Sequence, residues 1–559
     1  MENARLVLFA ALGMVLFLLW QAWQQDYRAR SAASTPGSSQ SEVVAPASVQ
    51  PDVPAAPAAS APTAAASSVE GPSAAEARAT PTAPADAPRV QVVTDVFRAE
   101  IDTAGGTLRR LDLPGYPVSA DEPEKPFRLL GNGEDLLFVA QSGLLSAGPA
   151  PNHHALYQAE RTEYSLAAGE DTLQVPLRWT SPEGLTVTKV YTFRRDSFVI
   201  DLEFRVENGT ASDWRGRPYG QLLRNRPPQG SRLFAYTYTG GVLHNEELRY
   251  DKVDFDRMLK GPVTVDGKGG WAAMIQHYFA AAFLPDQAAA THLYGRSLDA
   301  SRFLVGVVEP EVVVAPGAAG KLDLQLFVGP KVQERLAAAA PGLHLLVDYG
   351  YLTILAEPLF WLLQQIQRFV KNWGWSIVIL TVLIKLAFFH LSATSYRSMA
   401  RMRNLQPRLV SLKERYGDDR AKLNQAMMEL YRTEKVNPLG GCLPIVVQIP
   451  VFIALYWVLL ESVELRQAPF MLWIRDLSIH DPYFVLPITM GVTMLIQQRL
   501  NPSPVDPIQQ KVMMVLPVVF TVFFLFFPAG LVLYWLVNNT LSILQQWVIT
   551  RQLTKGSAA

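Results

Sequence analysis

Long runs without charged residues stand out along the chain, and they cover 6–25, 439–460, 482–498 and 512–550. A helix that crosses a bilayer needs about 20 apolar residues, so each run predicts at least one membrane span. The last run is long enough for two spans and contains "FFPAG", where Pro528 and Gly530 favour a tight turn. We therefore expect two spans in this run, joined by a very short hairpin.

One further run, between Lys371 and Arg397, is interrupted by a single lysine. Lys385 is the only charged residue in "SIVILTVLIKLAFFHLS". We expect a span here with a lysine near its middle, which brings the total to six transmembrane α-helices.

Between about Arg89 and Pro330 the pattern is different, and apolar and polar residues alternate with a period of two in several segments. In "SFVIDLEFRVENGT" the apolar side chains alternate with charged ones, which is typical of a half-buried strand. "LQVPLRWTSPEGLTVTKVYTF" predicts two strands around a Ser-Pro-Glu-Gly turn, and "KLDLQLFVGP" predicts another. The pattern favours a large all-β domain, an antiparallel β-sandwich.

The segment before this domain is rich in Ala, Pro and Ser and predicts a flexible linker. The first span begins after Arg5 and ends near Trp20 and Trp23, which suit a membrane interface. A cleavable signal peptide is the alternative, but the length of the run favours a retained anchor. The β-domain is then expected outside the cytoplasm.

Two amphipathic segments flank the lysine-containing span. "EPLFWLLQQIQRFV" places apolar residues on one helical face, which favours an interfacial helix over a packed helix of the β-domain. Further on, leucines recur at helical spacing on both sides of "YGDD". Gly417 suits the end of one helix, and Asp418 or Asp419 suits the start of the next. We expect a two-helix hairpin there.

Charge is segregated along the chain, although 50 basic and 50 acidic residues balance overall. The hairpin segment has ten Lys or Arg against five acidic residues, which indicates the cytoplasmic side. The loop "ESVELRQAPFMLWIRDLSIHD" has four acidic residues and two arginines, as expected on the periplasmic side. With basic residues returning at 499–511 and in the tail, both termini are expected in the cytoplasm.

These patterns predict the following divisions: N-terminal anchor 1–25, linker 26–88, periplasmic β-sandwich 89–330, connecting segment with the interfacial helix 331–372, second span 373–395, cytoplasmic hairpin 396–436, third span 437–460, periplasmic loop 461–481, fourth span 482–498, cytoplasmic loop 499–511, fifth span 512–527, sixth span 531–549 and tail 550–559.

Lys385 is the first candidate functional residue. A charge at the bilayer centre costs about 2.5–3.5 kcal/mol on insertion scales, so it usually faces protein or water. Thr381 lies one turn earlier on the same face, and Gln448, Asn538 and Asn539 interrupt other spans. Each amide can be a helix–helix hydrogen bond, and the lysine can snorkel to the interface. Together they favour a hydrophilic pocket.

The chain gives no positive sign of an enzyme. Its one cysteine, Cys442, excludes an internal disulfide and a cysteine-based metal cluster. The eight histidines form no H-x-x-x-H pair, and no phosphate-binding glycine motif follows a convincing strand. We expect no cofactor and no metal.

The quoted patterns resemble one family in order and in topology. "NWGWSIVILTVLIK", "SMARMRNLQPRL", "EKVNPLGGCLPIVVQIPVFIALYWVL", "SVELRQAPFMLWIRDLS" and "FFPAGLVLYWLVNN" are similar to the YidC/Oxa1/Alb3 family of membrane protein insertases. The resemblance covers about 349–553. The extra first span and the β-domain resemble the Gram-negative bacterial type, in which the periplasmic domain is a β-supersandwich and the other five helices form the insertase core.

The resemblance implies a groove that is open to the cytoplasm and to lipid. Its positive charge falls on Lys385, where bacterial members commonly carry arginine, and Thr381, Gln448, Asn538 and Asn539 are the expected polar lining. Apolar substrate segments are expected to slide along the third and fifth spans. The aromatic residues assigned to this slide are Phe452, Phe523, Phe524, Tyr534 and Trp535. The alternative for each of them is a simple packing or lipid-facing residue.

The implied function is a membrane protein insertase and chaperone of the bacterial inner membrane. Expected partners are nascent membrane proteins, the lipid bilayer, the Sec translocon with its accessory subunits, and the ribosome, with no sequence-specific nucleic acid. Because the tail is short, ribosome contact is expected to be weak or to occur through the hairpin, whose candidate residues are Arg401, Arg403, Arg408, Lys413 and Arg415. A secondary transporter with a substrate or proton site at Lys385 is the alternative, and a sugar- or protein-binding β-domain is a third possibility.

Overall fold

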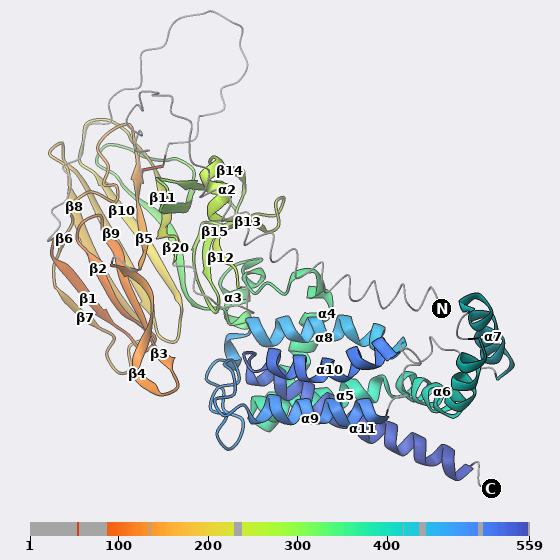
Figure 1. Ribbon diagram of the computed structural model, residues 1–559. Helices are drawn as coiled ribbons and strands as arrows, with labels where there is room; N and C mark the ends of the chain where they lie inside the picture. The colour runs from red at the N-terminus through yellow and green to blue at the C-terminus, as the bar shows by residue number, and fades with distance from the viewer. Residues whose placement is uncertain are drawn as a thin grey trace, which may run out of the picture. The chain divides into compact units, whose positions relative to one another are not determined.

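The computed structural model describes residues 53–54, 87–133, 136–227, 237–416, 419–434, 443–500 and 507–556 (Figure 1). The expected N-terminal anchor and nearly all of the expected linker lie outside the described residues. The chain divides into two compact units. We call 354–456 with 479–559 the helical unit, and Val49–Thr353 with Trp457–Ser478 the β unit.

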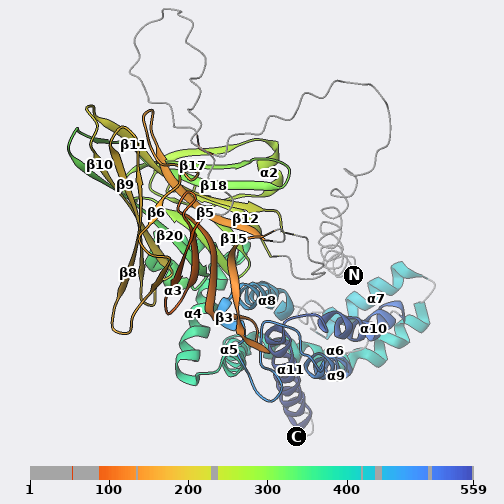
Figure 2. The ribbon, with the colours of Figure 1, turned by 90° about the vertical axis from the view of Figure 1, so that its left-hand side faces the viewer.

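The β unit is built from two sheets, which Figures 1 and 2 show from two sides. In pairing order, the 11-stranded sheet contains β14 (Val263–Lys268), β17 (Ala290–Ser297), β18 (Arg302–Val308), β11 (Trp214–Asn225), β5 (Leu137–Leu145), β4 (Glu122–Asn132), β3 (Thr107–Ser119), β2 (Arg98–Asp102), β1 (Arg89–Val93) and β7 (Glu163–Ser165), with β19 (Val312–Val314) beside β11. The 9-stranded sheet contains β13 (Asp251–Val253), β12 (Thr239–His244), β15 (Trp271–Gln276), β16 (Phe279–Leu284), β20 (Ala319–Pro330), β10 (Val199–Asn208), β9 (Leu185–Arg194), β8 (Thr172–Thr180) and β6 (Gln158–Ala159). A short helix, α2 (Phe255–Lys260), follows β13.

Apolar side chains from both sheets pack together to form the core. One cluster joins Leu144 and Trp214 of the first sheet to Val187, Phe204 and Leu322 of the second. On β10 the even-numbered residues from 200 to 208 are buried, and the odd-numbered ones are half-buried or exposed. The predicted period-two strand is therefore confirmed, and so is the large β-rich domain.

The predicted hairpin around Ser-Pro-Glu-Gly is also confirmed. β8 and β9 pair antiparallel, with Thr180 opposite Thr186. Gly184 has a φ of 98°, a left-handed conformation that glycine adopts at little cost. The amide of Gly184 donates to the carbonyl of Ser181 across the turn.

Two further segments complete the β unit. The connecting segment after β20 contains α3 (Gln333–Ala339) and the 3-10 turns Leu343–Leu346 and Gly350–Leu352. It is held to the sheet by Trp271, whose Nε1 donates to the carbonyl oxygen of Pro341 at 3.2 Å. The second segment, Trp457–Ser478, contains a 3-10 turn at Val463–Leu465.

The helical unit consists of helices that run largely side by side (Figure 1). They are α4 (Thr353–Val370), α5 (Trp373–Ala387), α6 (Phe389–Tyr416), α7 (Arg420–Thr433), α8 (Leu443–Glu461), α9 (Val485–Leu500), α10 (Pro507–Phe524) and α11 (Ala529–Gly556). The first residue of α4 and the last five of α8 belong to the β unit. α11 contacts α5, α6 and α9, and α10 packs on α9.

The helix expected over 373–395 is broken in the structure. α5 ends at Ala387, α6 begins at Phe389, and the two helices are bent by 67°. Lys385 consequently lies in the last turn of α5 instead of the middle of a longer helix. No proline or glycine lies between Lys385 and Arg397, so the residue types that usually mark a kink are absent from the sequence there.

By length and hydropathy, none of the described helices reaches across a bilayer alone. The bent pair of α5 and α6 meets the length and hydropathy requirement when the two helices are taken together. Two shorter apolar helical stretches, Val447–Glu461 and Gln510–Phe524, lie in α8 and α10.

Both amphipathic segments are helical, with differences from the predicted faces. α4 is 18 residues long and buries Ala356, Phe360 and Leu363, whereas Phe369 of the expected apolar face is exposed. In the hairpin, α6 and α7 pack on each other and bury Leu405 and Leu409. Asp419 caps α7, since its side chain accepts from the backbone N–H of Lys422 at 3.1 Å.

Glu464, in the 3-10 turn of the β unit, gives a pH-dependent term in the stability of that unit. Desolvation by burial raises the pKa of Glu464 to about 7. The negative charge of Glu334 adds to this increase, and the positive charge of Lys331 opposes it. Its Oε1 is buried without a hydrogen-bond partner among the described residues. A raised folded-state pKa means that this stability is fully present below the unfolded value of about 4.3 and is lost as the pH rises through 7.

We predict that Glu464→Gln weakens the pH dependence of thermal unfolding between pH 5 and pH 8. Between these pH values the free energy of unfolding should fall by about 2 kcal/mol less in the variant than in the wild type, after a discount for partial exposure of the side chain. Thermal unfolding of the solubilised full chain at both pH values measures the difference. Burial also raises the pKa of Glu309 to about 7, but Glu309 is unchanged in both proteins, so its effect cancels. Equal pH dependence in wild type and variant would contradict the prediction.

Candidate functional site

Lys385 is enclosed between α5 and α11. Its side chain reaches α11, where Nζ donates to Oγ of Ser542 at 2.8 Å, and the residue is only 8% exposed. The hydroxyl of Ser542 in turn donates to the carbonyl oxygen of Asn538 at 2.7 Å. A short chain of hydrogen bonds therefore runs from the ammonium group to the backbone of the last helix.

The ammonium group of Lys385 has no carboxylate within 4.0 Å among the described residues. An ammonium group carries three N–H donors, and Ser542 accepts from one of them. A serine hydroxyl is a neutral acceptor, so it does not neutralise the positive charge. A buried cation of this kind attracts an anionic group that can approach it.

The other polar residues predicted for this site are distributed over several helices. Thr381 is buried one turn before Lys385, but its hydroxyl donates to its own backbone, at the carbonyl of Ile377, 2.6 Å away. Asn539 is buried and its Nδ2 lies 3.5 Å from Oγ1 of Thr493 on α9. Asn538 and Gln448 are half-buried. Asn538 is linked to Lys385 through Ser542, whereas no contact ties Gln448 of α8 to the lysine among those described.

The direct partner of Lys385 is not among the residues predicted from the sequence. Ser542 and Gln546 are buried on α11, and Nε2 of Gln546 donates to the carbonyl oxygen of Leu500 at 3.3 Å. Together with Asn538 they recur every four residues along α11, which places them on one helical face. This spacing was available in the sequence, but serine is common in apolar helices and did not stand out.

The five aromatic residues predicted to line the slide lie in one connected cluster. Phe452 of α8 stacks on Tyr534, with ring centres 6.0 Å apart, and meets Trp535 edge-on at 4.8 Å. Trp535 contacts Phe524 of α10 at 5.6 Å, and Phe524 contacts Phe523 at 5.7 Å. The cluster joins α8, α10 and α11 through aromatic packing of favourable geometry.

The basic residues predicted on the hairpin lie on α6. Arg401, Arg403, Arg408 and Arg415 are exposed, and Lys413 is half-buried. Arg408 pairs with Glu434 at 2.5 Å, and both side chains remain open to solvent. The hairpin therefore presents positive charge on its surface.

The sequence of the whole chain matches one family. A "YidC periplasmic domain" profile matches residues 89–362 and a "60Kd inner membrane protein" profile matches residues 365–556. A membrane protein insertase YidC from Nitrosococcus oceani is 52% identical over 562 residues and covers 99% of both chains. The chain belongs to the YidC family of membrane protein insertases.

A second YidC relative agrees with this assignment. The YidC insertase of Alkalilimnicola ehrlichii is 53% identical, over 99% of this chain and 96% of its own. Among solved structures, an active YidC insertase with its first transmembrane domain resolved matches 81% of this chain and 90% of that chain, at 16% identity and a TM-score of 0.37.

Membership in the YidC family establishes function and location. The chain is a membrane protein insertase of the inner membrane, with a large periplasmic domain that corresponds to the matched β-rich region. Its substrates are newly made membrane proteins. The relatives that match over the whole length are insertases, which favours this function over the transporter alternative.

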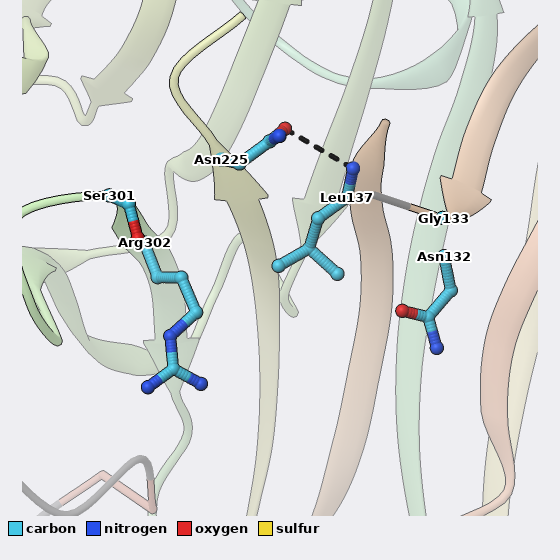
Figure 3. Close-up of a pocket in the computed structure, with 6 residues that line it drawn as sticks. All are labelled: Asn132, Gly133, Leu137, Asn225, Ser301 and Arg302. Carbon is cyan, nitrogen blue, oxygen red and sulfur yellow. Dashed lines mark hydrogen bonds between the residues drawn. The ribbon is translucent and has the colours of Figure 1, made fainter. Parts of the chain in front are cut away.

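The periplasmic domain has a pocket of about 590 Å³, which Figure 3 shows with its six lining residues. They are Asn132, Gly133, Leu137, Asn225, Ser301 and Arg302. None is aromatic or acidic, so the pocket lacks the stacking rings and paired carboxylates that would mark a sugar site. Asn225 Oδ1 accepts from the backbone N–H of Leu137 at 3.2 Å. Among the described residues, this pocket gives the sugar-binding alternative no support.

We predict that Ser542→Ala destabilises the helical unit of this YidC protein, because it leaves the Lys385 ammonium without its acceptor. Hydrogen bonds to charged groups contribute about 1.5–3 kcal/mol, and thermal unfolding of the solubilised protein should report a loss of this order. Thr540→Ala is the matched control, since Thr540 has an exposed hydroxyl on the same helix that donates to the carbonyl of Leu536 within that helix. An equal loss in both variants would argue against a special role for Ser542.

Proposed function

We propose that this YidC insertase moves apolar segments of new proteins from the cytoplasm into the inner membrane through a hydrophilic groove. Lys385 offers a positive charge to acidic or polar parts of the substrate. Thr381, Gln448, Asn538 and Asn539 provide the polar lining. The observation that carries the proposal is the buried Lys385 ammonium, which has a serine and no carboxylate beside it among the described residues.

The energetics of this step follow from the two kinds of substrate segment. A polar segment resists entry into hydrocarbon because its charges and backbone groups lose water. Attraction to Lys385 offsets part of that cost, and it is stronger inside the protein than in water because the effective dielectric constant is lower. The apolar segment gains free energy by entering lipid. The insertion therefore needs no nucleotide hydrolysis.

The aromatic cluster is the proposed path for the apolar segment. The path consists of a connected cluster of rings from α8 across α10 and α11, in which Phe524 and Tyr534 are buried and the other three are half-buried: Phe452, Phe523 and Trp535. Nε1 of Trp535 is buried without a partner among the described residues. A substrate carbonyl beside it would supply the missing acceptor.

The membrane topology is also part of the proposal. Six spans cross the bilayer: the N-terminal anchor, α5 with the first residues of α6 (373–395), and α8, α9, α10 and α11. The hairpin and both termini then lie in the cytoplasm, and the loop after α8 lies in the periplasm. The alternation of basic and acidic loops supports this arrangement. α4 is proposed to lie in the membrane interface, which is consistent with its exposed Trp361 and Phe369.

We predict that Lys385→Ala and Lys385→Glu reduce insertion of substrates whose translocated segment is acidic. The loss of one charged contact should lower insertion at least about tenfold, which corresponds to about 1.4 kcal/mol. Protease protection of the translocated segment, in cells depleted of the native insertase, measures it.

The controls separate charge from side-chain shape. Lys385→Arg keeps the charge and should retain most activity, and Lys371→Ala removes an exposed lysine just before α5. A substrate without acidic residues in its translocated segment should be inserted almost equally by all variants. Normal insertion of the acidic substrate by both Lys385→Ala and Lys385→Glu would overturn the electrostatic role.

The hairpin is the proposed contact with the ribosome, and the Sec translocon is a proposed second partner. Ribosomal RNA is a dense array of phosphates, which exposed arginines bind in a salt-dependent manner. The exposed apolar residues of α9, which include Ile488, Val492 and Ile496, are available to lipid or to a helix of the translocon.

We predict that replacing Arg401, Arg403, Arg408, Lys413 and Arg415 by glutamine weakens co-sedimentation with ribosomes at low salt and flattens its salt dependence. Replacing three exposed basic residues of the β unit, Arg98, Arg215 and Lys260, is the control and should change neither. Binding that is unchanged, or that is equally weak in both variants, would contradict the assignment to the hairpin.

A further inference from the structure

Lys331 lies at a junction inside the β unit. It is the first residue after β20, and its backbone N–H donates to the carbonyl of Tyr278 at 2.8 Å. Its side chain is only 2% exposed. Nζ lies 2.9 Å from Oε2 of Glu461 and 3.3 Å from the carbonyl oxygen of Leu346. The ammonium group thus contacts two passages of the chain that are far apart in sequence.

Both passages lead to helices that continue into the helical unit. Leu346 belongs to the connecting segment that runs into α4. Glu461 is the last residue of α8, and its side chain is 7% exposed. All three residues belong to the β unit, so Lys331 fixes the ends of both passages to the last strand of the sandwich.

A second set of contacts holds the segment that follows Glu461. Arg466 donates through Nη2 to the carbonyl of Pro117 on β3 at 2.6 Å. Its guanidinium group lies over the stacked rings of Phe127 and Phe279, 5.8 and 5.6 Å from their centres. Just before Glu461 in the sequence, a ring nitrogen of His277 lies 3.1 Å from the carbonyl oxygen of Leu460. The last turn of α8 is therefore held on both sides of Glu461.

A buried ion pair is better suited to fixing a position than to adding stability. The cost of removing both charges from water largely cancels their attraction, whereas loss of one partner leaves an uncompensated buried charge. Any arrangement of the chain that separates the two charges while they stay buried is therefore costly in free energy, and the paired arrangement is favoured. Buried polar groups that fix the register of packed helices use the same principle.

We propose that Lys331 and Glu461 are positioning residues for insertion. By fixing the last turn of α8 to the end of β20, they set the orientation of the helix that carries Phe452, about two and a half turns earlier. Neither residue touches the substrate. The proposal rests on the proposed role of Phe452 in the slide, and it gives the periplasmic domain a mechanical task in the insertion reaction.

The test compares hydrogen exchange with insertion in the full-length protein in proteoliposomes. The variants are Lys331→Met, Glu461→Gln and the double variant Lys331→Met/Glu461→Met. Lys321→Met is the matched control, because Lys321 lies on β20, which Lys331 follows, but its own side chain is exposed although it pairs with Glu203 and Asp323. The substrate has no acidic residue in its translocated segment, so failure of the Lys385 mechanism does not affect the result.

The single variants should exchange amides of 457–468 at least about tenfold faster than wild type, while 185–208 in the sandwich stays protected. Insertion per folded protein should fall about tenfold in the same variants and remain normal in Lys321→Met. Unchanged exchange in 457–468, or insertion at the wild-type rate by either single variant, would overturn the proposal.

The double variant separates positioning from stability, because replacing both charges by methionine removes the unpaired buried charge. If the pair positions α8, the double variant regains thermal stability, but it keeps fast exchange in 457–468 and low insertion. If insertion returns to the wild-type rate along with stability, the pair is only structural and the proposal is wrong.

Discussion

A positive charge enclosed by protein needs an acceptor, and the kind of acceptor determines what the charge can do. Among the residues that the structure describes, three lysines are buried, and each has a different set of hydrogen-bond acceptors. Lys189, inside the sandwich, donates to three backbone carbonyls. Lys331 has a carboxylate and a carbonyl. Lys385 has one serine hydroxyl. The lysine with the least complete set of acceptors is the one in the helical unit, where a substrate anion would complete it.

The buried charges of the two units have different surroundings. In the β unit the alternation of apolar and polar residues buries a continuous core, and its buried charges serve to fix the structure. In the helical unit the apolar residues are widely exposed on α9 and α10, as expected for helices surrounded by lipid. There the buried polar residues are the exceptional ones. The same residue type therefore has a structural role in the β unit and, in our proposal, a role toward the substrate in the helical unit.

The sequence predicted the elements whose pattern is local. The alternation around Phe204 and the turn at Gly184 are properties of neighbouring residues, and both appear as expected. The break after Ala387 did not appear in the pattern, because it occurs within an apolar run without proline or glycine. Ser542 was missed because its importance depends on which helix packs against α5. The spacing of polar residues on α11 does not by itself identify Lys385 as the partner, which lies 157 residues away in the sequence.

The β unit is discontinuous in sequence, and this limits how it can be studied. A fragment that covers only the sandwich and the connecting segment lacks Trp457–Ser478, which belongs to the same compact unit. Such a fragment would expose the ammonium group of Lys331 and the paired rings of Phe127 and Phe279 to solvent. Exposed apolar rings next to an unpaired charge favour nonspecific binding of other molecules. Binding measured with an isolated periplasmic fragment would therefore partly report capture by a surface that the intact chain covers with its own residues.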